Sequence, residues 1–126
     1  MTRAKPADTK PMQAIRKLAL RLPEVEESVV CSKAAFKARG KGFLFMGMDE
    51  SSWNLLLKLG PSLPEAAKLA AKEPQHYGVG GRDWVSVTFP HTASPPPGLM
   101  EHWIDESFRL LAPKKLVATL PAAKAW

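Results

Sequence analysis

Residues 35–46 read Ala-Phe-Lys-Ala-Arg-Gly-Lys-Gly-Phe-Leu-Phe-Met, and apolar and basic residues alternate up to a break at Gly40-Lys41. Two alternating segments around such a break predict a β-hairpin with a two-residue loop. The register that this loop sets pairs Arg39 with Gly42, Ala38 with Phe43, and Phe36 with Phe45. The stretch therefore predicts two neighbouring antiparallel strands, over about 34–39 and 42–48.

The two faces of this predicted hairpin differ in chemistry. Because side chains alternate along a strand, one face is expected to be apolar and to consist of Phe36, Ala38, Phe43 and Phe45. Lys37 and Arg39 then point the other way, and Lys41 lies at the turn. The pattern predicts a hairpin with a basic tip that is anchored by phenylalanines.

The residues on either side of the hairpin predict helices and more strands. Apolar residues at helical spacing favour a helix over 12–22, which Pro23 ends. The remaining elements are expected as strands over 26–32, 53–59 and 84–89, helices over 62–72, 99–111 and 114–120, and a glycine-rich loop over 75–82. This order predicts an α+β fold, in which an antiparallel β-sheet of about five strands is packed by N- and C-terminal helices.

Length and composition predict one soluble domain. The 126 residues suffice for a single hydrophobic core, expected over 11–120 between a flexible N-terminal tail (1–10) and a C-terminal tail (121–126). No apolar stretch is long enough to span a bilayer, and the first residues lack the apolar core of a signal peptide. The single Cys31 excludes an intramolecular disulfide and fits a reducing compartment. We therefore expect a cytoplasmic protein without a membrane partner.

Positive charge is concentrated in two segments. The formal net charge is +6, yet residues 1–22 hold six basic residues against Asp8, and residues 33–41 hold four basic residues and no acid. The predicted first helix contributes Arg16, Lys17 and Arg21, and the hairpin contributes Lys37, Arg39 and Lys41. Together these six residues could form a footprint for a polyanion. A solvated basic surface without a ligand is the alternative.

The motifs of catalysis, metal binding and nucleotide binding are weak in this chain. His76, His91 and His102 lack the paired spacing of a zinc site. The glycines at 78, 80 and 81 precede a strand and not a helix, so no helix dipole would face a phosphate. No serine lies in a nucleophile motif. We expect no cofactor, no metal and no catalytic residue, although an enzyme whose groups converge only in the fold stays open.

A second candidate site involves Trp84. This residue should point to the sheet face opposite Val85 and Val87, close to Leu56 and Lys58. Lys58, Arg82 and Trp84 would then place an aromatic ring among cations, which suits nucleic acid, a small anionic ligand or a protein. The alternative is that Trp84 fills a second core beneath a helix.

Five segments of the chain form a recognisable ordered set: 15–27 (Ile-Arg-Lys-Leu-Ala-Leu-Arg-Leu-Pro-Glu-Val-Glu-Glu), 35–41 (Ala-Phe-Lys-Ala-Arg-Gly-Lys), 57–59 (Leu-Lys-Leu), 83–85 (Asp-Trp-Val) and 107–111 (Ser-Phe-Arg-Leu-Leu). Taken in this order, they resemble the MmcQ/YjbR family of small bacterial proteins. The resemblance implies an α+β domain related to the CyaY/frataxin-like fold. It also implies a double-wing arrangement that has been proposed to bind DNA, in which residues 37–43 would be one wing. The second wing would come from residues 48–53, which are acidic at Asp49 and Glu50.

A frataxin-like fold also raises iron binding, but the residues oppose it. Iron at a protein surface requires clustered carboxylates, whereas the predicted first helix carries Arg16, Lys17 and Arg21 and no acid. Kinship of fold without the site does not transfer the function.

Taken together, the sequence predicts a non-enzymatic module that binds duplex DNA with weak sequence preference. Lys37, Arg39 and Lys41 are expected to contact phosphates, and the basic residues of the first helix would extend the contact. The alternative is a module that binds a protein or a small anionic ligand through Lys58, Arg82 and Trp84. The sequence leaves the oligomeric state open.

Overall fold

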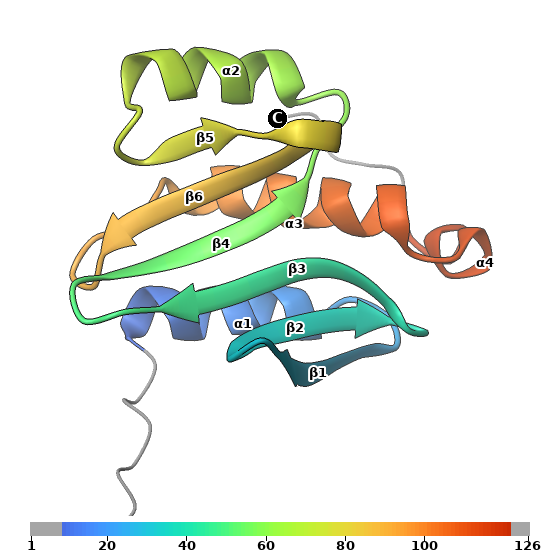
Figure 1. The fold of residues 1–126 in the computed structure, drawn as a ribbon. Helices are drawn as coiled ribbons and strands as arrows, with labels where there is room; N and C mark the ends of the chain where they lie inside the picture. The colour runs from blue at the N-terminus through green and yellow to red at the C-terminus, as the bar shows by residue number, and fades with distance from the viewer. Residues whose placement is uncertain (1–8, 122–126) are drawn as a thin grey trace, which may run out of the picture.

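The protein is described by a computed structural model that covers residues 9–121, in which a six-stranded antiparallel sheet is backed by helices (Figure 1). The helices are α1 (Lys10–Leu20), α2 (Leu63–Lys72), α3 (Pro97–Leu111) and α4 (Lys114–Val117), with a 3-10 turn η1 (Gly81–Asp83). The strands are β1 (Val25–Val30), β2 (Lys33–Ala38), β3 (Lys41–Met48), β4 (Ser52–Lys58), β5 (Tyr77–Val79) and β6 (Trp84–Pro90). Their order across the sheet is β1-β2-β3-β4-β6-β5. The predicted α+β class is confirmed. Of the predicted tails (1–10 and 121–126), residues 1–8 and 122–126 lie outside the described residues, and α1 already begins at Lys10.

The sixth strand lies where the sequence predicted a loop. β5 is only three residues long and pairs with β6 at the edge of the sheet. Gly78 leaves room there for the Ser86 side chain, because a Cβ atom at this position would lie 2.8 Å from the Ser86 hydroxyl oxygen. A short edge strand that contains glycine has little of the alternating apolar pattern that identifies strands in a sequence.

The hairpin between β2 and β3 forms, but the predicted register is wrong. The loop consists of Arg39 and Gly40, whose φ angles of 48° and 83° are both in the left-handed region that a type I′ turn requires. Ala38 consequently pairs with Lys41, and not with Phe43. One residue further along, a β-bulge shifts the ladder between Phe36 and Lys37.

The bulge changes the face on which Phe45 lies. Beyond it, Phe36 pairs with Leu44, and Phe45 pairs with Ala35. Phe36 and Phe43 are fully buried, whereas Phe45 turns to the other side of the sheet and is only half-buried. The expectation that Phe45 shares the face of Phe36 and Phe43 is therefore wrong, because a shift of one residue exchanges the faces of all residues that follow.

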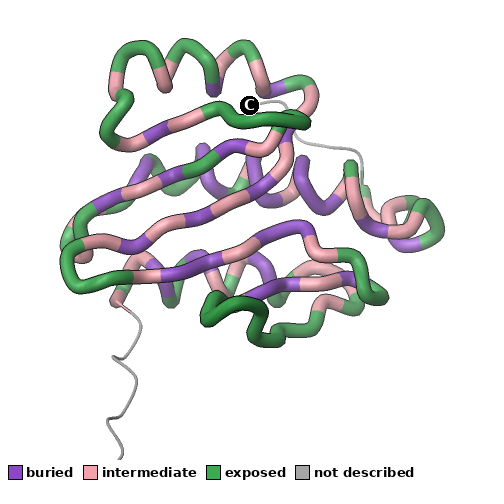
Figure 2. The backbone as a smooth tube through the Cα atoms, in the orientation of Figure 1, coloured by how far each residue is buried: buried purple, intermediate pink, exposed green. Residues whose placement is uncertain are grey.

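The hydrophobic core fills the space between the sheet and the helices α1 and α3. Buried residues alternate with partly or fully exposed residues along β4 and β6, as the colours in Figure 2 show. Phe43 packs edge-on against Phe108 of α3, with ring centroids 5.3 Å apart. Trp53 and Trp103 are also fully buried, and their indole N–H groups donate to the carbonyl of Ala93 and to the Glu65 carboxylate.

Ser107 of α3 connects two neighbouring strands at the level of the bulge. Its hydroxyl donates to the Phe43 carbonyl of β3 at 2.6 Å and accepts from the Lys58 N–H of β4 at 3.0 Å. The direct pairing of β3 with β4 begins one step further on, at Leu44 and Leu57. Because Ser107 is completely buried, water cannot reach this place, and the Ser107 hydroxyl supplies the hydrogen-bond partner of both backbone groups.

Glu106, the preceding residue, performs a similar task for the turn that starts α2. Its carboxylate accepts from the backbone N–H groups of Gly60 and Ser62 at 2.8 and 3.0 Å, and from the Ser62 hydroxyl at 2.7 Å. These donors precede the helix and would otherwise lack a protein partner in a turn that is partly buried. Two successive polar residues of α3 thus fix both the sheet and the entry into α2.

The strand connection made by Ser107 predicts the effect of its removal. We expect Ser107→Ala to lower the free energy of unfolding by about 1–3 kcal/mol, because two buried backbone groups lose their partner. Ser28→Ala on the exposed strand β1 is the matched control and should change stability by less than about 0.5 kcal/mol. Urea denaturation monitored by circular dichroism measures both. Equal unfolding free energies for the two variants would contradict the role of the hydroxyl.

Candidate nucleic-acid interface

In the part of the chain that the structure describes, no helix packs on one side of the sheet, which faces the viewer in Figure 1. We call this side the open face. The strand register assigns to it the outward residues of the four central strands β2, β3, β4 and β6, among them Lys33, Lys37, Gly42, Phe45, Gly47, Asn54, Leu56, Lys58, Trp84, Ser86 and Thr88.

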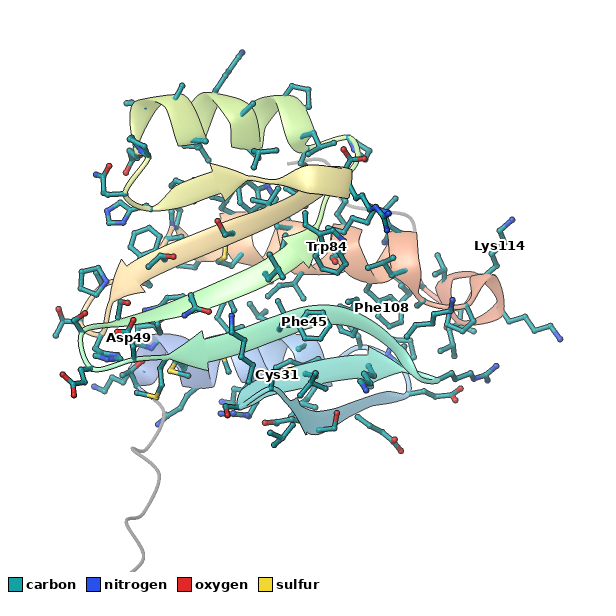
Figure 3. All side chains as sticks on the ribbon, in the orientation of Figure 1. Cys31, Phe45, Asp49, Trp84, Phe108 and Lys114 are labelled. Atoms are coloured by element: carbon teal, nitrogen blue, oxygen red, sulfur yellow. The ribbon has the colours of Figure 1, made fainter. Side chains whose placement is uncertain are left out.

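An aromatic pair lies in the middle of the open face. The rings of Phe45 and Trp84 pack with centroids 6.0 Å apart and an angle of 53° between their planes, and Figure 3 shows both side chains on the viewer's side. Leu56 pairs with Phe45 across the sheet, and Lys58 pairs with Trp84. The predicted neighbourhood of Trp84 is confirmed, while the alternative of a second core beneath a helix is not what the structure shows.

Lysines surround this aromatic pair. Lys33 and Lys37 lie on the outward side of β2, and Lys58 lies on β4. The outward residues of β2, β3, β4 and β6 include no carboxylate, and the acid closest by register is Glu26, which pairs with Lys37 from β1. Lys33 reaches across Gly47 and donates to the Asn54 side chain at 3.3 Å. The centre of the open face is therefore positively charged.

Arg39, which was predicted to contact phosphate at the hairpin tip, is held by an acid. Its guanidinium donates two hydrogen bonds to the Glu24 carboxylate, at 2.9 and 3.0 Å. The hydrogen bond to Arg39 lowers the pKa of Glu24 below its usual value, and the bond to Glu24 raises the pKa of Arg39. At the tip only Lys41 has no ion pair with a described residue, and it lies at the rim opposite Ala38.

The basic residues of the first helix lie on the other side of the sheet. Arg16 makes a bidentate pair with Glu27 at 2.9 and 3.0 Å, and Arg21 lies 3.7 Å from Glu101 of α3. Lys17 and Arg21 border a groove of about 350 Å³ between α1, α3 and the proline-rich linker before α3. The structure therefore does not bring the six predicted DNA contacts onto one surface.

Arg82 lies beside the open face as the middle residue of η1. It is exposed, and its φ of 57° places it in the turn that leads directly into Trp84. The neighbouring Asp83 carbonyl accepts from the Leu59 N–H, which fixes this turn to the end of β4. Lys58, Arg82 and Trp84, predicted as a second site, are thus neighbours at one end of the open face.

The connection of residues 48–53 lies far from the hairpin tip. Consecutive turns of an antiparallel meander alternate between the two ends of the sheet, so Asp49 lies at the end opposite to Arg39 and Gly40 (Figure 3). Asp49 accepts from the backbone N–H groups of Ser51 and Ser52, which lower its pKa and keep it ionised. Two wings that act on one ligand from the same end cannot be formed by these two turns.

The described residues offer less for catalysis or metal binding. Ser62 and His102 lie 3.2 Å apart beside Glu106, but the Glu106 carboxylate contacts the Ser62 hydroxyl and does not orient the far nitrogen of the imidazole. This differs from a nucleophilic triad, in which the histidine lies between the serine and the acid. Within residues 9–121, no three His, Cys, Asp or Glu side chains meet to hold a metal ion. None of the helices in this range is long and apolar enough to cross a membrane.

Sequence reasoning missed two residues of the open face. Phe45 was placed in the core because the bulge was not foreseen, and Lys33 was counted only as charge. The adjacent apolar residues Phe43 and Leu44, which break the alternation, are the signal that could have revealed the bulge.

Comparison with known proteins identifies a family but no characterised relative. The sequence model of the YjbR family matches residues 20–110, which is more than half of the chain. No curated protein matches this chain. The matched range includes the open face, the hairpin and most of α3.

The pair of Glu24 and Arg39 predicts a measurable pKa. In Arg39→Gln the pKa of Glu24 should rise towards 4.5, because its main stabilising hydrogen bond is lost. Lys37→Gln, which removes the same charge nearby but no bond to Glu24, should leave this pKa unchanged. A carboxyl-detected NMR titration measures both variants.

The sign of the linked stability change follows from the direction of the shift. Since the pKa of Glu24 is lower in the folded state, the pair stabilises the protein at neutral pH, and this contribution disappears as the pH falls through the folded-state pKa. An unchanged Glu24 titration in Arg39→Gln would show that the pair does not persist in solution.

Proposed function

This chain belongs to the YjbR family, and we propose that it binds nucleic acid through the open face of its sheet. One observation carries the proposal: Phe45 and Trp84 lie among outward lysines on four strands whose outward residues include no carboxylate. Aromatic rings supply stacking surfaces for bases, and the ammonium groups attract phosphates. The family match itself adds the fold but names no ligand.

The hairpin contributes less than its sequence indicated. Lys37 lies on the open face and remains in the proposed contact, whereas Lys41 lies at the rim opposite Ala38 and is not counted among the contacts. Arg39 would have to exchange Glu24 for a phosphate, and Arg16 and Arg21 are paired with acids on the far side of the sheet. Three contacts, from Lys33, Lys37 and Lys58, support a slope of about −2 to −3 when log K is plotted against log salt.

The competing function uses the same place. A protein or a small anionic ligand could bind around Lys58, Arg82 and Trp84, at one end of the open face. Such a ligand would not depend on Lys33 and Lys37, which lie on β2, two strands away from β4. The lysines of β2 therefore distinguish the two proposals.

Neutralising the open face should weaken DNA binding and flatten its salt dependence. We expect the triple variant Lys33/Lys37/Lys58→Gln to lose about 2 to 3 units of the slope of log K against log salt, because up to three phosphate contacts disappear. The probe is fluorescein-labelled DNA of 20 nucleotides per strand. The control Lys17/Lys68/Lys72→Gln removes three exposed lysines from α1 and α2 and should retain the slope of the unaltered protein. Fluorescence anisotropy at four salt concentrations measures both, with the DNA as a strand and as a duplex.

Two results would contradict the proposal. Absence of binding to either form of DNA at low salt would exclude nucleic acid as the ligand. Equal losses in the two triple variants would assign the binding to net charge alone and not to the open face.

A further inference from the structure

The open face is built for unpaired bases, and we infer that its ligand is single-stranded nucleic acid and not a duplex. This inference rests on the proposed function and specifies its substrate class. It is carried by the environment of Trp84, by the glycines beneath Phe45 and Lys33, and by the shape of the face.

Trp84 differs from the two core tryptophans that the structure describes. Trp53 and Trp103 are fully buried, and each donates its indole N–H to a protein acceptor. Trp84 is only half-buried, and its N–H has no hydrogen-bond partner among residues 9–121. Both part of its ring and its donor are thus available to a ligand, as stacking on a base with a hydrogen bond to a base or sugar would require.

Glycine keeps the middle of the open face flat. The ring of Phe45 lies over Gly42, where a Cβ atom would come within 2.8 Å of the Cζ atom of the ring. Lys33 crosses Gly47 in the same way, at 3.1 Å from such a Cβ atom. Towards the β5 edge of the sheet, the outward side chains of β4 and β6 include the short polar groups of Asn54, Ser86 and Thr88. Leu56, Lys58 and Trp84 are the larger outward side chains on these two strands. A nucleic-acid strand can therefore lie directly on the sheet beside the rings.

A duplex fits this surface poorly. Its bases are stacked inside the helix, and a protein reads them by inserting a helix or a two-stranded ribbon into the major groove. The helices α1 and α3 lie behind the sheet, and the tip of the β2–β3 ribbon is tied down by the pair of Arg39 and Glu24. The open face offers rings and ammonium groups, which unpaired bases and their phosphates can reach together.

Electrostatics alone predicts the opposite preference, which makes the inference testable. A duplex carries twice as many phosphates per unit length as one strand, so a surface that uses only lysines binds the duplex more tightly. Preference for the single strand requires stacking. Replacing Trp84 should remove that preference while the salt dependence remains.

The experiment compares a 20-nucleotide mixed-sequence DNA strand, the RNA strand of the same sequence, and the 20-base-pair DNA duplex, all fluorescein-labelled, at 50 mM salt. The strand that binds more tightly identifies DNA or RNA as the source and is used with the variants. We expect this strand to bind at least fivefold more tightly than the duplex. Trp84→Leu should weaken its binding roughly tenfold to a hundredfold, whereas Trp84→Phe, which keeps an aromatic ring, should stay within about fivefold of the unaltered protein.

Controls keep the result interpretable. Leu110→Ala removes an exposed apolar side chain from α3 on the other side of the sheet and should not change binding. Urea unfolding of each variant establishes that it is folded at the temperature of the assay, and Trp84→Val, which also lacks an aromatic ring and suits a β-strand, replaces Trp84→Leu if the latter is not.

The outcomes separate this inference from the proposed function. Binding to the duplex that equals or exceeds binding to both strands would overturn the inference and leave nucleic-acid binding intact. Preference for a strand that survives unchanged in Trp84→Leu would overturn it as well, because stacking on Trp84 would not be its cause. Absence of binding to all three probes would overturn the inference together with the proposed function.

Discussion

The side-chain hydroxyl of Ser107 joins β3 to β4 at the place where their backbones do not pair directly. This insertion is compatible with the bulge in β3, which lets Phe43 and Leu44 both enter the core and turns Phe45 outward. The part of β3 that leads to Phe45 is thus bonded to a helix that lies behind the sheet. Glu106, one residue earlier, holds the turn before α2 by three hydrogen bonds, so that α3 is bonded both to the central strands and to the entry into α2.

The ion pairs decide which part of the positive charge is available. The chain has a formal net charge of +6, and its sequence concentrates basic residues in the first helix and the hairpin. In the folded protein Arg16, Arg21 and Arg39 are each beside a glutamate. The lysines of the central strands face outward without a carboxylate among them. These lysines lie on the same face of the sheet as Phe45 and Trp84. A nucleic acid bound there could contact the ammonium groups with its phosphates and the aromatic rings with its bases.

Local patterns predicted most of the elements, and long-range contacts account for what was missed. The side on which Trp84 lies, and its nearness to Lys58, followed from simple alternation along β4 and β6. Alternation did not predict the register of the hairpin. A two-residue loop at Gly40-Lys41 and one at Arg39-Gly40 both contain Gly40, and the sequence does not distinguish them. At the bulge, the Phe43 carbonyl accepts a hydrogen bond from the Ser107 hydroxyl, which is 64 residues away in the sequence. Arg39 pairs with Glu24, which is 15 residues away. No window of sequence around the hairpin contains that information.

The distances along the chain also govern when the fold can be completed. The Phe43 carbonyl and the Lys58 amide receive their partner from a residue 64 and 49 positions later, respectively. During synthesis from the N-terminus, β3 and β4 emerge seconds before α3 does, and loop closure over such separations is slow. In that interval the core side of the meander, including Phe43, lacks the helix that covers it. The nascent chain is consequently most prone to aggregation just before α3 appears. The apolar side of the strands stays uncovered until this helix has been synthesised and has packed on it.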